Sequence, residues 1–137
     1  MVAGRFRTHR SSLMPIPGEP SSKLLPITAI YGGNASGKST FVHAMKCLRR
    51  IVLTGKVTHV EPHLFAAEGK TTPTSFKCIF VSEDRVMKYH IDILSGKVVR
   101  ESLDDITKGQ EKCIFDRIPG EQCVVGSQFV DDFPVEE

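Results

Sequence analysis

The residues with the clearest chemistry form a glycine-rich run that ends in a lysine and two hydroxyl residues. The run consists of Gly32, Gly33, Asn34, Ala35, Ser36, Gly37, Lys38, Ser39 and Thr40. It fits the phosphate-binding loop (Walker A) pattern G-x-x-x-x-G-K-[ST], in which backbone N–H groups surround the phosphates of a nucleotide. Glycine suits such a loop because it lacks a Cβ atom. Lys38 would contact the β- and γ-phosphates, the Ser39 hydroxyl would bind magnesium, and Thr40 would bond the α-phosphate side.

The segments on either side of this run predict the elements that must position it. Residues 27–31 are β-branched and aromatic, which favours a buried strand. Apolar residues recur at steps of three and four after the loop, which predicts a helix from Lys38 to Leu53 that stops near Gly55. The helix N-terminus would add free N–H groups and a positive dipole end. The alternative is a glycine-rich turn without a ligand.

Composition favours one small globular domain. The chain has 137 residues, of which 40% are hydrophobic and 25% are charged. Its formal net charge of +2 gives no general attraction to nucleic acid or to a membrane surface. No apolar run approaches the roughly 20 residues that a membrane span needs. We therefore expect a cytoplasmic protein whose four separate cysteines are small buried apolar residues.

The second half of the chain has the rhythm of an antiparallel sheet. Hydrophobic and polar residues alternate, so we expect strands at 75–81, 87–93, 98–103 and 112–116. Ser95-Gly96 lies where a tight hairpin turn is expected. Residues 11–23 are rich in proline and serine and predict a connection without regular structure. The basic residues of the helix predict a solvated outer face; they are Lys46, Arg49 and Arg50.

Residues 31–40 resemble the phosphate loop of the ABC/SMC-like branch of AAA-annotated ATPases, which includes bacterial proteins of abortive infection and other phage defence. Asn34, Ala35 and Ser36 are the letters that distinguish this branch from most phosphate-loop families. Residues 6–10 look like the N-F-R-S-H/F segment on the first strand of SMC, Rad-fifty and RecF-like ATPases. The antiparallel region of the same bacterial proteins is similar to three further segments, namely 73–76, 87–91 and 98–103.

The resemblance implies an α/β fold: a partial P-loop NTPase of the ABC/SMC-like head type, with strand, P-loop and helix followed by an antiparallel β meander. Residues 1–25 would be an N-terminal strand and a Pro/Ser-rich connection. Residues 26–137 would be the N-terminal lobe of an ABC-like ATPase domain, with its C-terminal lobe missing. Within it, 26–56 would hold the strand, loop and helix, and 74–117 the antiparallel strands.

The resemblance also implies ATP and Mg²⁺ as cofactors and a homodimer formed through the nucleotide. Gly32 through Thr40 would hold the phosphates, Lys38 would be catalytic, and Arg7 and Thr8 would lie near the nucleotide. Hydrolysis in the complete protein would drive dimerisation and an effector output, for example phage defence through a nuclease partner. Binding of nucleic acid is left open.

The sequence departs from that family in ways that limit the expected activity. It shows no convincing Walker B acid, helix-opening signature or switch histidine. Residues 94–97 resemble the start of the ABC signature but lie between two alternating segments, so we expect a hairpin turn there. We therefore expect this chain alone to be inactive as an ATPase. The alternatives are a non-hydrolysing ATP-sensing module for a partner protein, a small P-loop kinase, and a scaffold with a degenerate loop.

Overall fold

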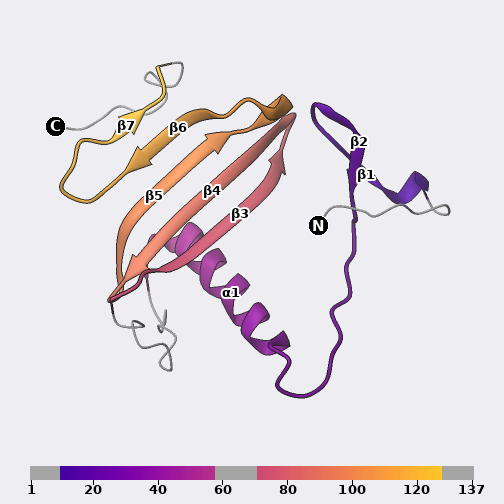
Figure 1. Cartoon of the computed structure of the whole chain (residues 1–137), viewed down its shortest axis with the longest axis horizontal. Coiled ribbons are helices and arrows are strands. Elements are labelled where there is room, and N and C mark those ends of the chain that lie inside the picture. The colour runs from indigo at the N-terminus through magenta and orange to yellow at the C-terminus, as the bar shows by residue number, and fades with distance from the viewer. Residues whose placement is uncertain (1–9, 58–70, 128–137) are drawn as a thin grey trace.

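The computed structural model of the chain describes residues 10–57 and 71–127. These residues form a two-stranded hairpin, one α-helix and a five-stranded antiparallel sheet, which is a mixed α/β arrangement (Figure 1). Arg7 and Thr8, together with the segment that resembles a family's first strand, lie outside the described residues.

The sheet is a simple meander in which each strand pairs with the next along the chain, in the order β3-β4-β5-β6-β7. Its strands are β3 (Thr74–Ser82), β4 (Arg85–Leu94), β5 (Lys97–Asp105), β6 (Lys112–Arg117) and β7 (Val124–Val125). The β4–β5 turn has Ser95 at φ 51° and Gly96 at φ 74°, and two positive φ values in succession are typical of a tight hairpin turn. Residues 94–97 are therefore a hairpin, as the alternation on both sides of them predicted.

Alternation of side chains gives the sheet one apolar face, and the helix α1 (Lys38–Thr54) packs against that face. Ile91 and Ile93 are buried there with Ile51 of the helix, and Ile91 is only 1% exposed. Residues that pack around these three are Cys47, Leu48, Val57, Phe76, Tyr89 and Val98. The four cysteines were expected to be buried, but each is a half-buried free thiol.

The helix begins and ends as the sequence predicted. Gly55 follows its last residue with φ 64° and donates its N–H to the Ile51 carbonyl at 2.8 Å, which is a common glycine termination. The sheet covers only part of the helix. Phe41 and Met45, near its N-terminus, remain about half exposed, and Figure 1 shows this end of α1 extending past β3.

The predicted strand at residues 27–31 is wrong. The segment has no strand assignment, and Ile27 and Tyr31 are 84% and 88% exposed. The residue types suit a buried strand, but a strand also needs a hydrogen-bonding neighbour and a surface to cover it. In the described part of the chain, no strand lies beside this segment.

The prediction of an irregular connection at residues 11–23 is also wrong. A short hairpin forms there from β1 (Met14–Ile16) and β2 (Glu19–Leu24). Gly18 turns the chain with φ 78°, and a Cβ atom on it would lie 2.7 Å from the side chain of Lys108. Contact between this turn and the loop after β5 explains why glycine is required at the tip.

Candidate phosphate-binding loop

The loop that precedes α1 is closed by its own lysine. Lys38 is the first residue of the helix, and its ammonium group turns back toward the beginning of the loop. Nζ donates to the carbonyl oxygens of Gly32 at 2.7 Å and Gly33 at 2.6 Å, and to Ser36 Oγ at 3.2 Å. The side chain of Lys38 thus connects the start of the helix back to the first two residues of the loop, Gly32 and Gly33.

The backbone of the loop turns so that the helix starts without a cap. Ala35 has φ 60° and Gly37 has φ 84°, both in the left-handed region. No side chain caps the helix, and its first turn holds no acidic residue. The first hydrogen bond of the helix runs from Phe41 N to Gly37 O at 3.0 Å, so the preceding N–H groups have no intrahelical acceptor. A helix of 17 residues whose N-terminus is left uncapped in this way favours an anion at that N-terminus.

The three glycines lack a Cβ atom, which permits positive φ, but they do not share one role. Only Gly37 adopts it. Gly32 is needed for space, because a Cβ atom there would lie 2.8 Å from Ser36 Oγ. A Cβ atom on Gly33 would meet nothing within 4 Å. Glycine would therefore be required at position 33 only if a bound ligand came close to the backbone there.

The predicted residues from Ala35 to Thr40 line one cavity of about 170 Å³. Lys38 is half-buried and the other lining residues are exposed. Gly32 and Gly33 border the loop through their carbonyl contacts with Lys38. Asn34 lies on the turn between these groups and does not line the cavity. Arg7 and Thr8 fall outside the described residues.

The donor set fits a magnesium-bound triphosphate. Neither hydroxyl of Ser39 and Thr40 has a hydrogen-bond partner within the described residues, and both line the cavity. Magnesium in nucleotide sites takes few protein ligands and completes its shell with phosphate oxygens and water. One hydroxyl on Ser39 is compatible with that coordination. Within the described ranges, no group of three or more His, Cys, Asp or Glu side chains could hold a metal.

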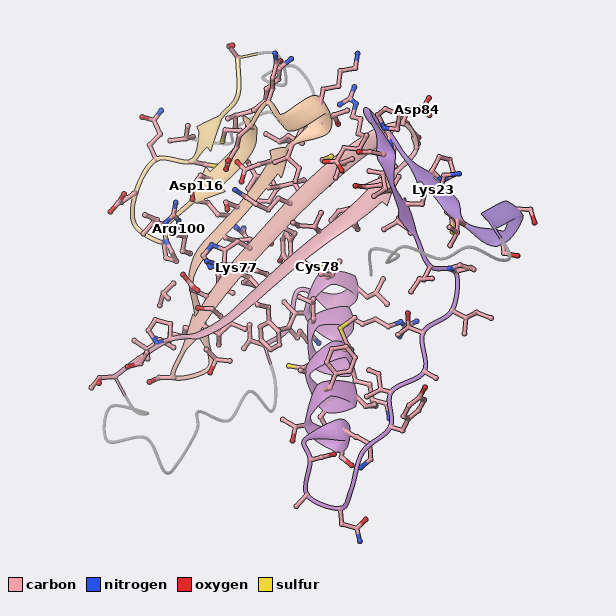
Figure 2. The ribbon with its side chains drawn as sticks, turned by 45° about the vertical axis from the view of Figure 1, so that its right-hand side comes forward. Lys23, Lys77, Cys78, Asp84, Arg100 and Asp116 are labelled. Atoms are coloured by element: carbon pink, nitrogen blue, oxygen red, sulfur yellow. The ribbon has the colours of Figure 1, made fainter. Side chains whose placement is uncertain are left out.

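A second cavity, of about 220 Å³, lies on the polar face of the sheet and was not predicted. In the sequence, the polar residues at every second position of β4 indicated this face; they are Lys88, His90 and Asp92. The lining residues come from β3, β4, β5, β6 and the segment before β6; they are Lys77, Lys88, His90, Arg100, Ser102, Asp104, Glu111 and Asp116. Figure 2 shows Lys77, Arg100 and Asp116 on these strands.

Most charges in this second cavity are already paired. Arg100 donates to Asp116 at 2.8 Å, and Lys88 lies 3.3 Å from Asp104 and also binds Glu111. The hydrogen bond from Arg100 lowers the pKa of Asp116. The cluster therefore links neighbouring strands through charge-assisted bonds, and it offers a ligand no concentrated charge of one sign.

Comparison with protein-family models, with curated proteins and with solved structures gave no match to this chain. Within the described ranges, no helix is both long enough and apolar enough to cross a bilayer. The case for a function therefore depends on the geometry of the loop at residues 32–40.

Proposed function

We propose that this chain binds Mg²⁺-ATP through the loop at residues 32–40. The observation that carries the proposal is the position of the Lys38 ammonium group, which bridges the first two loop carbonyls beside an uncapped helix N-terminus. A triphosphate in the cavity would receive N–H donors from the backbone and a positive charge from Lys38. Ser39 would supply one oxygen to magnesium.

The resemblance of the sequence supports a more specific role, the N-terminal lobe of an ABC/SMC-like ATPase. In that role, binding and hydrolysis of ATP drive dimerisation through the nucleotide and an output in an effector, such as a nuclease of phage defence. Lys38 and magnesium would stabilise the charge that develops during phosphoryl transfer. An acid that positions water and a second helix N-terminus at the γ-phosphate would complete the reaction.

An ATP-sensing module is the second candidate, and one observation favours it. No carboxylate lines the loop cavity in the described part of the chain, so these residues offer no group there to orient an attacking water. We therefore expect binding without appreciable turnover. Robust, Lys38-dependent ATP hydrolysis by the purified 137-residue chain would contradict this expectation.

Isothermal titration calorimetry with Mg²⁺-ATP tests the binding proposal. Lys38→Ala removes a charged donor to phosphate, and such hydrogen bonds contribute about 1.5–3 kcal/mol, so the affinity should fall by at least about tenfold. Lys46→Ala is the matched control, because it removes an equal charge from an exposed position on the same helix. Absence of a binding signal with the folded wild-type chain would refute the proposal.

A further inference from the structure

The outer edge of β3 has the features of a strand that pairs with another chain. In the described part of the protein, β3 pairs only with β4, and its other edge has no neighbour. All nine of its residues pair with β4 without a register shift, and only Lys77 carries a charge. Ile79 and Phe80 remain 65% and 40% exposed. Natural proteins usually protect a long apolar edge with charges, proline, a bulge or a covering segment.

The sequence of β3 is complementary to itself in one antiparallel register. When two copies pair about Cys78, all nine positions find a partner. Phe76 then lies opposite the partner's Phe80, and Lys77 lies opposite the partner's Ile79, each pair occurring twice. Aromatic cross-strand pairs of this kind stabilise sheets, and no like charges are opposed. A register centred on Lys77 would instead place the two ammonium groups opposite each other, and a register centred on Ile79 would leave the first strand positions unpaired.

The helix α1 extends toward the same edge. Figures 1 and 2 agree that its N-terminal half projects past β3, on the face of the sheet where Phe76 packs. Phe41 and Met45 lie on this projecting half and are about half exposed. A two-fold axis perpendicular to the sheet keeps equivalent faces on the same side. The projecting half of each helix would therefore lie over the partner's sheet, on the side where Phe80 is exposed.

We propose that two copies of this chain associate through antiparallel pairing of their β3 edges about Cys78. The two five-stranded sheets then form one continuous sheet, and each α1 covers part of the partner. This dimer does not pass through the nucleotide, so it forms without ATP. It is independent of the proposed function, because a chain unable to bind ATP would still dimerise.

The first test measures association without nucleotide by sedimentation equilibrium. The wild-type chain should be dimeric. Ile79→Lys should raise the dissociation constant of the dimer by about tenfold or more, because it places two lysines opposite each other twice. Val124→Lys is the matched control, since Val124 is 61% exposed on β7, at the other edge of the sheet, and it should leave the dimer unchanged.

A compensating variant tests the register itself, because residue 79 lies opposite Lys88 of the same chain equally in the single and the double variant. Lys77→Glu combined with Ile79→Lys opposes unlike charges in the proposed register, so the double variant should regain the dimer. A monomeric wild-type chain would overturn the proposal. So would a dimer that Ile79→Lys does not weaken, or a double variant that stays as weak as the single one.

Disulfide capture gives an independent measurement of the same register. Directly opposed residues of antiparallel strands have Cα atoms about 4.5 or 5.5 Å apart, which a disulfide can span. A chain that keeps Cys78 and has serine at the other three cysteines should give a covalent dimer with copper phenanthroline, which accepts two electrons as two thiols lose their protons. The chain with only Cys78→Ser should give none. A dimer captured equally well in both chains would refute this pairing.

Discussion

Two neighbouring glycines in the loop should respond differently to the same added methyl group. Gly32 and Gly33 are adjacent, neither has a positive φ, and both contribute a carbonyl to Lys38. A Cβ atom on Gly32 would lie 2.8 Å from Ser36 Oγ and 3.4 Å from Ser36 Cβ, whereas one on Gly33 would meet nothing within 4 Å. Gly32→Ala should therefore weaken the loop more than Gly33→Ala does.

The magnitude follows from what Ser36 must give up. Its hydroxyl can avoid the new methyl group by rotating about χ1, but rotation breaks its 3.2 Å hydrogen bond with Lys38. An intramolecular hydrogen bond contributes about 1 kcal/mol, which corresponds to about fivefold in a dissociation constant. We expect Gly32→Ala to weaken Mg²⁺-ATP binding by about fivefold, and Gly33→Ala to change it by less than about twofold.

Calorimetry on a double-mutant cycle isolates this cause. Ser36→Ala removes the obstructing hydroxyl, so Gly32→Ala should add no further loss in that background. Equal losses from the two glycine substitutions would show that ligand approach, rather than packing within the loop, requires glycine. An additive double variant would show that Ser36 is not the obstacle.

Two further predictions concern the scaffold. Ile91→Ala should lower the free energy of unfolding in urea by about 3 kcal/mol, because Ile91 is 1% exposed at the centre of the core, and Val124→Ala, at a position 61% exposed on β7, should change it by less than about 0.5 kcal/mol. Hydrogen bonds from Thr107 lower the pKa of Asp105, so its contribution to stability is present above the ordinary pKa of an aspartate and is lost as the pH falls through the lowered value. Asp105→Asn should reduce the free energy of unfolding at pH 7 by about 1 kcal/mol. When the urea midpoint of unfolding is measured against pH, the variant should lose less stability at acid pH than the wild type, and an equal loss would refute the contribution of Asp105.

The elements that the sequence predicted well are those defined by local contacts. The helix from Lys38 to Thr54 ends at a glycine that closes it through Ile51, within one turn. The hairpin at Ser95-Gly96 requires only two positive φ values between alternating strands. Both signals lie in a few neighbouring residues, so a single sequence contains them.

The elements that the sequence predicted badly depend on neighbours that are distant in the chain. Residues 27–31 have the composition of a strand, but no strand lies beside them in the described residues. The hairpin at residues 14–24 forms although its sequence is rich in proline and serine, and its glycine tip contacts Lys108. Neither the missing partner nor the contacting loop is visible in the local sequence pattern.

The candidate site is also defined by local contacts. Lys38 reaches its three acceptors across sequence separations of only two, five and six residues. The shape of the loop therefore does not require residues 27–31 to pair as a strand. The same bonds are exposed, and exposed bonds contribute little to global stability. A triphosphate that supplies more acceptors to the same donors would order the loop and raise the thermal midpoint in proportion to the logarithm of its concentration. In the proposed function, the loop geometry is therefore formed before binding, and a bound triphosphate would supply most of its rigidity.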